Sequence, residues 1–150
     1  MEGIDKLFSG MRAAASGMSA ERLRIDVVAK NIANANTTRT PDGGPYRRQL
    51  VNFAPLLDRA IDSHGTPGSR REVVGVRVAS VTSDDVTPLP RVFDPANPDA
   101  DAQGYVTLPN VNPVMEMADL ITATRAYEAN VAAQEEFVAM AERALRLIQS

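Results

Sequence analysis

Cysteine and tryptophan are absent from this 150-residue chain, and aromatic residues make up only 5% of it. The lack of cysteine excludes disulfides, thiolate metal sites and cysteine nucleophiles, and it suits an oxidising compartment without proving one. The single histidine, His64, lies in a segment rich in Gly, Pro and Ser. Without a second imidazole, the usual catalytic triads and most transition-metal sites lack their parts. We therefore interpret His64 as a solvated loop residue and predict that the protein is not an enzyme.

Long hydrophobic runs and strong charge of one sign are also missing. No segment approaches the roughly 18 consecutive apolar residues of a membrane span, and no basic stretch followed by an apolar core marks a secretory signal. The net charge of -3 comes without a basic stripe, which argues against nucleic acid as a partner. Two arginine pairs, 47–48 and 70–71, are the densest positive charge. We interpret both as surface residues that favour solubility, with a contact to another protein or to a polar matrix as the alternative.

The acidic segment 94–101 suggests a calcium site, but its spacing does not fit one. Counted from Asn97, an EF-hand loop needs Gly at its sixth position and Glu at its twelfth. The chain has Ala102 and Leu108 there. The sequence therefore indicates no metal, no cofactor and no small-molecule substrate.

Apolar residues at a 4-3 spacing run along both ends of the chain. One polar residue interrupts the spacing between Ile4 and Ala35, and two interrupt it between Met117 and Ile148. A repeat sustained over more than four heptads is typical of coiled-coil packing. We predict helices over about 4–35 and 112–150 that pair with each other, with other subunits, or with both. The expected helix–helix or assembly contacts are Leu7, Met11, Met18, Ile25, Val28, Ile32, Leu120, Tyr127, Val131, Val138, Leu145 and Ile148.

Local signals mark the inner ends of both helices. Asn31, Asn34 and Asn36 are expected to fix the exit of the first helix by bonding backbone groups, and Pro41 cannot continue it. At the second helix, Asn112 suits the N-cap and Pro113 suits the first helical position. The sequence thus predicts a sharp stop and a sharp start.

Glycines 3, 10 and 17 are seven residues apart inside the first helix, so they share one face. Each costs about 1 kcal/mol of helix propensity relative to Ala. Two interpretations stay open: a helix that is weak near its start, or a smooth strip that lets another backbone approach closely. Both make the order of this helix depend on partners.

The middle of the chain, 37–111, holds most of the prolines and much of the β-branched content. We predict a mainly α protein: a discontinuous antiparallel helical hairpin or coiled coil, 1–36 plus 112–150, with 37–111 as a small β-containing insertion. Pro88 and Pro90 cannot donate backbone hydrogen bonds to a sheet, so we expect the candidate strand 86–93 to be an edge strand or an irregular segment. The candidate strands are 46–53, 74–78, 86–93 and 105–108, with a turn of helix at 56–61 and a loop at 63–72.

Several motifs resemble the bacterial flagellar axial proteins, which form the rod, the hook and the hook-filament junction. Helix one closes on NIANANT at 31–37, and GGPYRRQ follows at 43–49. Residues 94–106 and 109–133, the latter reading PNVNPVMEMADLITATRAYEANVAA, narrow the match to proximal-rod subunits. The eight residues 38–45 that precede Tyr46 fit that subtype rather than hook protein.

The resemblance implies a structural role in the basal body. Such proteins are substrates of the flagellar type III export apparatus and leave the cytoplasm without a cleaved signal. They polymerise in the periplasm, with one another and with other rod subunits, into a tube lined by paired terminal helices. Segment 37–111 is then expected to make lateral contacts between neighbouring subunits. The alternative from another class is a soluble cytoplasmic coiled-coil adaptor or export chaperone.

Overall fold

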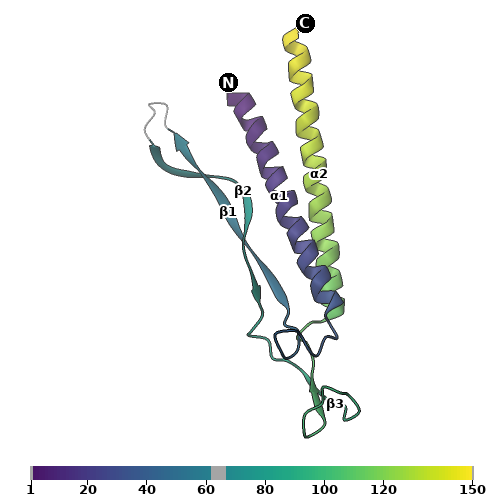
Figure 1. The fold of residues 1–150 in the computed structure, drawn as a ribbon. Helices are drawn as coiled ribbons and strands as arrows, with labels where there is room; N and C mark the ends of the chain where they lie inside the picture. Colours follow the sequence, from purple (N-terminus) through teal and green to yellow (C-terminus); the bar gives the residue numbers. More distant parts are fainter. Residues whose placement is uncertain (1, 62–66, 150) are drawn as a thin grey trace. The chain divides into compact units, whose positions relative to one another are not determined.

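The computed structural model describes residues 2–61 and 67–149, so His64 and its predicted loop position lie outside the described residues. Along the chain, helix α1 (Glu2–Ala33) precedes four strands and helix α2 (Pro113–Gln149) follows them. The strands are β1 (Gln49–Ile61), β2 (Pro67–Ser83), β3 (Arg91–Phe93) and β4 (Tyr105–Thr107). Figure 1 shows this order, with β1 beside β2 as one two-stranded sheet and β3 paired with β4 as another.

The start of α2 follows the predicted signals. The side-chain Oδ1 of Asn112 accepts hydrogen bonds from the backbone N–H groups of Val114 (3.0 Å) and Met115 (3.4 Å). This is the N-cap arrangement, which satisfies donors that have no partner within the first turn. Pro113 occupies the first helical position, where its missing N–H costs nothing.

The chain forms two compact units, each of which draws on both helices and on the β1–β2 pair. The first unit contains Met1–Leu23, Phe53–Ala79 and Ala123–Ser150, and the second contains Arg24–Asn52 and Ser80–Thr122. The division expected from sequence, 1–36 plus 112–150 against 37–111, follows the secondary structure of the chain and stays a prediction.

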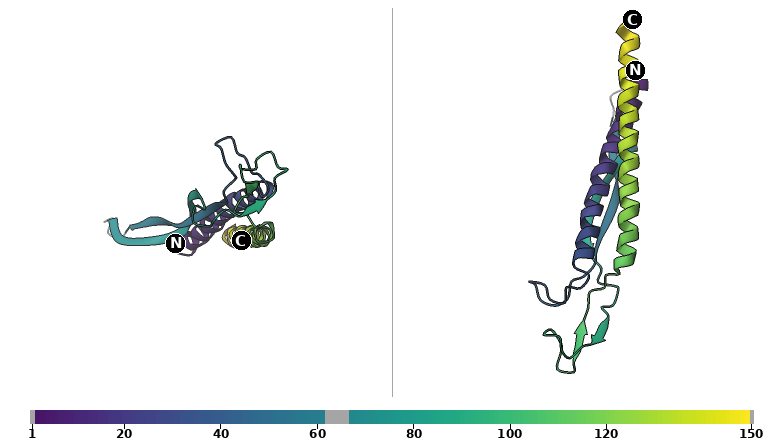
Figure 2. Two further views of the ribbon diagram at one scale, coloured as in Figure 1. Left: turned by 90° about the horizontal axis from the view of Figure 1, so that it is seen from below. Right: turned by 90° about the vertical axis from the view of Figure 1, so that its right-hand side faces the viewer.

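In the first unit, α1 and α2 pack closely through the glycine strip of α1. A Cβ on Gly10 would lie 2.5 Å from the Phe137 ring, and a Cβ on Gly17 would lie 2.6 Å from Oδ1 of Asn130. Seven residues separate both the glycines and their partners, and α1 and α2 stay side by side in the views of Figure 2. The helices are therefore antiparallel here, and side chains of α2, rather than its backbone, lie directly over these two glycines.

Strand β2 approaches the other side of α1 in the same unit. A Cβ on Gly75 would clash with Oγ of Ser16. That hydroxyl donates to the Ala13 carbonyl (2.7 Å) and accepts the N–H of Val76 (3.1 Å). A small residue on each element thus lets a strand backbone lie against a helix.

In the second unit, the end of α1 lies beside the start of α2. Asn31 on α1 donates to the Glu116 carboxylate on α2 at 2.9 Å. Between them, residues 41–44 form a turn in which Gly43 and Gly44 have φ of +87° and +79°. These left-handed values are accessible to glycine at little steric cost.

The second small sheet also belongs to this unit. Strands β3 and β4 are antiparallel, and Val92 pairs with Val106.

The central β region is larger than predicted. Strand β1 continues through 56–61, so the predicted turn of helix there is wrong. Strand β2 begins at Pro67, so the predicted loop at 63–72 is wrong over its last six residues. Strand pairing outweighed local propensity in both cases, because a partner strand rich in valine favours the extended form. The protein therefore combines two terminal helices with a central antiparallel β region, and "mainly α" describes it only in part.

The interior is thin and consists mostly of small side chains. Burying a large aliphatic side chain contributes about 1.5–3 kcal/mol, and Ala and Val contribute at or below the lower end of that range. The described core therefore offers modest stabilisation for a chain of this length. Its buried hydrophobic residues are Ala14, Ala20, Val27, Val28, Tyr46, Val106 and Ala123.

We expect Gly10→Ala to destabilise the protein although alanine is the better helix former. The propensity gain of about 1 kcal/mol is opposed by overpacking against the Phe137 ring, which typically costs about 1–3 kcal/mol. Urea unfolding followed by circular dichroism measures the balance. Phe137→Leu in the same chain should restore part of the loss, and Ala15→Gly at an exposed position calibrates propensity alone. A gain of the full propensity term in Gly10→Ala would contradict the close packing.

Candidate functional site: a buried polar cluster and an exposed helix face

Asn31 is the most highly connected buried polar side chain described. It is 1% exposed, and its amide nitrogen donates to the Gln49 carbonyl and to Oε2 of Glu116, both at 2.9 Å. Its Oδ1 accepts the N–H of Gln49 and the hydroxyl of Tyr46, also at 2.9 Å. An asparagine amide has two donor hydrogens and two acceptor lone pairs, and all four are used.

Glu116 supplies the charge at this site. Its side chain is 1% exposed, and Oε1 accepts from Nε of Arg48 at 2.5 Å. Arg48, 28% exposed, also reaches Oδ2 of Asp119 at 3.1 Å, and Arg24 lies 3.7 Å from the other Asp119 oxygen. A buried carboxylate is tolerable because a guanidinium and an amide both bond it.

Tyr46 completes what we call the Asn31 cluster. Its ring is buried, and its hydroxyl donates to Asn31. Burial, and secondarily the negative charge of Glu116, raises the pKa of the Tyr46 phenol above its ordinary value of 10.0. The phenol is thus held protonated, as its donor role requires. The cluster consists of Asn31, Tyr46, Arg48, Gln49, Glu116 and Asp119.

Asn110 extends the network to the residues that follow strand β2. Its Oδ1 accepts the backbone N–H of Arg48 at 2.8 Å. Its amide nitrogen donates to the carbonyls of Asp84 (2.9 Å) and Thr87 (3.2 Å). The polar side chains of the second unit therefore tie together the helix end, both strand ends and the start of α2. This arrangement holds the segments in fixed directions relative to one another within the unit.

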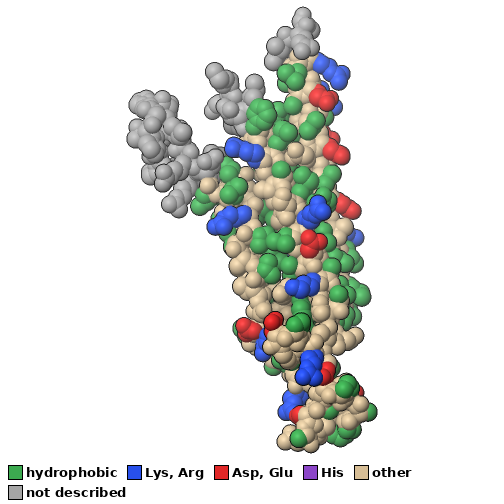
Figure 3. Space-filling model, viewed as in Figure 1, with side chains coloured by type: hydrophobic (Ala, Val, Ile, Leu, Met, Phe, Trp, Pro, Cys, Tyr) green, Lys and Arg blue, Asp and Glu red, His purple; other side chains and the backbone are tan. Residues whose placement is uncertain are grey.

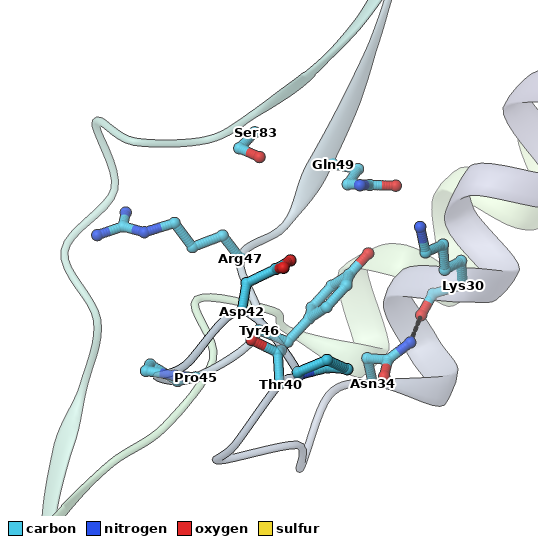
Figure 4. Close-up of a pocket in the computed structure, with 10 residues that line it drawn as sticks. Lys30, Asn34, Thr40, Asp42, Pro45, Tyr46, Arg47, Gln49 and Ser83 are labelled. Atoms are coloured by element: carbon cyan, nitrogen blue, oxygen red, sulfur yellow. Dashed lines mark hydrogen bonds between the residues drawn. The ribbon is translucent and has the colours of Figure 1, made fainter.

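A shallow pocket of about 390 Å³ adjoins the cluster. Figure 4 shows the Tyr46 ring among the lining residues, with Lys30 and Gln49 on one side and Arg47 extending the other way. The Asn34 amide donates to the Lys30 carbonyl at 2.9 Å, so this part of the wall is occupied by helix-end bonding.

The acidic segment 94–101 forms turns that its own side chains stabilise. Oδ1 of Asp101 accepts the backbone N–H groups of Gln103 and Tyr105, each at 2.9 Å, and these bonds, with Arg91 alongside, lower the pKa of Asp101. Asp99 accepts the Thr38 hydroxyl at 2.7 Å. Within residues 2–61 and 67–149, no group of three or more His, Asp or Glu side chains is placed to hold a metal ion.

The three asparagines predicted at the helix exit have different surroundings. Asn31 bonds the backbone of Gln49 in both directions. Asn34 donates to the Lys30 carbonyl and accepts the Thr37 hydroxyl at 3.2 Å. Asn36 is exposed.

The predicted interface residues differ in burial. Val28 is buried, while Val138 (40% exposed) and Leu145 (59%) are exposed. The Ile148 side chain lies outside the described residues. Their role in assembly stays a prediction. The half-buried members are Leu7, Met11, Met18, Ile25, Ile32, Leu120, Tyr127 and Val131.

The α2 residues that face α1 precede the predicted seam by one position. Glu116, Asn130 and Phe137 contact α1, whereas the predicted spacing runs through 117, 131 and 138. One residue corresponds to about 100° of rotation around the helix. The glycine strip selects this phase, since it lets polar and aromatic side chains of α2 sit directly over the α1 backbone.

This rotation leaves an apolar face of α2 exposed, which we call the outer stripe. In the second unit it contains Val114 (74% exposed), Met117 (51%) and Ile121 (56%), at a 3-4 spacing. In the first unit it contains Val138 and Leu145, seven residues apart. Figure 3 likewise shows hydrophobic side chains at the surface, interspersed with charged ones. No helix among the described residues combines the length and apolar character needed to cross a membrane.

Comparison with known proteins gives consistent matches along the chain. Residues 11–39 match the family "Flagella basal body rod protein", and residues 102–147 match "Flagellar basal body rod FlgEFG protein C-terminal". The chain is 47% identical to the flagellar basal-body rod protein FlgC of Borreliella burgdorferi, over 95% of this chain and 98% of that one. It is 39% identical to FlgC of Bacillus subtilis, over 93% and 97%.

The chain belongs to the FlgC family of flagellar basal-body rod proteins. FlgC of Salmonella typhimurium, 42% identical over 79% of this chain and 80% of its own, is a further relative. The resemblance inferred from the motifs at 31–37, 43–49 and 109–133 is confirmed. Of the Asn31 cluster, Asn31 lies in the first matched segment and Glu116 and Asp119 lie in the second, whereas Tyr46, Arg48 and Gln49 lie between the two.

Arg48, Glu116 and Asn110 are the residues whose role the sequence did not reveal. The arginine pair 47–48 was expected at the surface, and this is wrong for Arg48, which is half-buried in ion pairs. Glu116 looked like an ordinary acidic residue near a helix N-terminus. No local feature of the sequence marks it as buried, because its partners Asn31 and Arg48 are 85 and 68 residues away in the chain.

We expect Asn31→Asp to lower the free energy of unfolding by about 3 kcal/mol or more. The change removes two donors and sets a carboxylate beside the buried Glu116 carboxylate, and uncompensated buried charge typically costs about 3–5 kcal/mol. Adding Glu116→Gln should recover a substantial part, because an amide can donate to the new carboxylate. Urea unfolding of the two single variants and the double variant tests this. Strict additivity of the two losses would contradict direct coupling between these side chains.

Tyr46 should make stability sensitive to high pH. Because its pKa is raised on folding, the folded state holds the phenolic proton more tightly than the unfolded state. The resulting stabilisation is complete below the unfolded value near pH 10 and is lost as pH rises through the folded value. The difference in tyrosinate absorbance between the parent protein and Tyr46→Phe isolates this group. A Tyr46 transition below pH 10 would show that the phenol is not buried beside Glu116.

Proposed function

We propose that the protein is a structural subunit of the flagellar basal-body rod and that it polymerises through its terminal helices. In this role it forms part of the periplasmic drive shaft that transmits torque to the hook. It assembles with copies of itself and with other rod subunits. Nothing in this role requires bound cofactor or substrate turnover.

The observation that carries the proposal is the outer stripe of α2. Met117 and Ile121 are more than half exposed, although the 3-4 spacing of the stripe is one that normally packs against another helix. In the same unit, the chain's own α1 is already engaged on another face of α2, through the hydrogen bond from Asn31 to Glu116. The stripe is therefore available for a neighbouring subunit.

Energetics favour order that comes with assembly. The described core consists mainly of Ala and Val, whereas fixing backbone costs about 1–2 kcal/mol per residue. Covering Val138, Leu145 and their equivalents in the second unit would add about 1.5–3 kcal/mol for each large aliphatic side chain. Such a subunit can pass through a narrow export channel unfolded and become rigid when neighbours cover it.

We further propose export by the flagellar type III apparatus without a cleaved signal. In cells that lack the flagellar export gate, a rod subunit stays in the cytoplasm and is missing from the basal bodies of those cells. A cytoplasmic adaptor would keep the same location in both backgrounds. Fractionation with and without the gate therefore separates the two functions.

The purified subunit should gain helix when it assembles. Dilute monomer should show clearly less helical circular dichroism per residue than polymer, because the outer stripe lacks cover in the monomer. Met117→Ser combined with Ile121→Ser should reduce assembly, while Arg125→Ser at an exposed charged position on the same helix should not. A dilute monomer with two fully formed, cooperatively melting helices would oppose the proposal.

A further inference from the structure

A groove of about 320 Å³ runs between α1 and β2 in the first unit. On the helix side it is lined by Ser16, Ser19, Ala20 and Leu23, and on the strand side by residues 76–78. The walls are mostly apolar, and Leu23 is 38% exposed.

The sequence explains why the groove stays open. Gly75 holds β2 close to Ser16, but the next strand residues that line the groove are Val76 and Val78. Opposite them the helix presents small side chains, such as Ser19 and Ala20, which do not fill the space between. The groove is thus shaped to take side chains from outside.

The same unit carries a protruding counterpart. Val138 and Leu145 lie one heptad apart on α2 and are 40% and 59% exposed. α2 meets its own α1 through Asn130 and Phe137, and no α2 residue lines the groove. One molecule therefore offers an apolar trough and an apolar ridge at separate places.

Charge is complementary between the two surfaces. Arg77 lines the groove and is exposed, and Arg22 is exposed one helical turn beyond Ser19. The ridge is flanked on its own helix by exposed Glu135 and Glu142. Glu142 also lies 3.9 Å from Arg146 in an exposed i,i+4 pair, which a neighbouring arginine would have to replace or share. Exposed ion pairs contribute little energy, so these charges select orientation while the apolar contact stabilises.

We propose that the α1–β2 groove receives the Val138/Leu145 face of α2 from a second copy of this chain. This rests on the proposed function and names the contact that would carry it between like subunits. The contact is heterologous: each copy uses its groove for one neighbour and its ridge for another. Repetition of such a contact gives a ring or an open helical array rather than a closed dimer.

Cysteine crosslinking tests the contact cleanly, because the native chain contains no cysteine. Cells that produce two tagged forms, one with Ser19→Cys and one with Val138→Cys or Leu145→Cys, supply basal bodies for mild oxidation. A disulfide needs Cα atoms about 4.4–6.8 Å apart. We expect a heterodimer band for at least one ridge position. The matched control is Met140→Cys, which is exposed on another face of the same helix and should give at least tenfold less product.

Charge exchange adds a readout that folding defects would not mimic. Arg77→Glu in the groove chain should lower the crosslink yield severalfold, and Glu142→Lys in the ridge chain should restore it. Loss without restoration would count against the proposed orientation.

The outcomes separate this contact from the proposed function. Basal bodies that contain both forms but give no Ser19 crosslink to either ridge position overturn the groove contact and leave rod assembly intact. A Ser19 crosslink to a different rod subunit overturns the second-copy assignment and also leaves rod assembly intact. Absence of the unsubstituted chain from purified basal bodies overturns the proposed function itself.

Discussion

The structure depends on one buried amide. Asn31 uses all four hydrogen-bonding positions of its side chain, on Gln49, Tyr46 and Glu116, and is almost fully buried. Asn31 and these partners come from three places that are distant in sequence: the last turns of α1, the segment that leads into β1 and the first turn of α2. Because an unsatisfied buried amide or carboxylate costs several times what a neutral contact contributes, the three segments order together or not at all.

Each helix divides its surface between internal and external packing. Gly10 and Gly17 of α1 face α2. The α2 side chains that pack against them are Phe137 and Asn130 rather than aliphatic residues. The aliphatic face that a coiled coil would normally bury is left outside, with Ile121 at 56% exposure. In a member of a rod-protein family, this division of the helix surface gives one short chain apolar residues for its own folding and further apolar residues for contact with neighbours.

The sequence predicted the elements at the chain ends well and the middle poorly. Asn112 and Pro113 signal the start of α2 through local capping chemistry, which needs no tertiary information. The turn of helix expected at 56–61 is wrong because this segment pairs with β2, and cross-strand contacts outweigh local preference. Arg48 was expected at the surface, because nothing near it in sequence announces that Glu116 will lie beside it.

By itself, the sequence determined two terminal helices, where they end inwardly, the absence of cysteine chemistry and a family resemblance carried by short motifs. These follow from backbone propensity, capping and residue identity. Only the tertiary structure decided which face of each helix turns inward. Periodicity favoured the more apolar phase of α2, through 117, 131 and 138, whereas the residues that contact α1 are Glu116, Asn130 and Phe137, one position earlier. The close approach that glycine permits selects this second phase. It also decided that a polar cluster, rather than the aliphatic seam, fastens the inner ends of the helices, because hydrogen bonds between residues up to 85 apart in sequence cannot be inferred from local pattern.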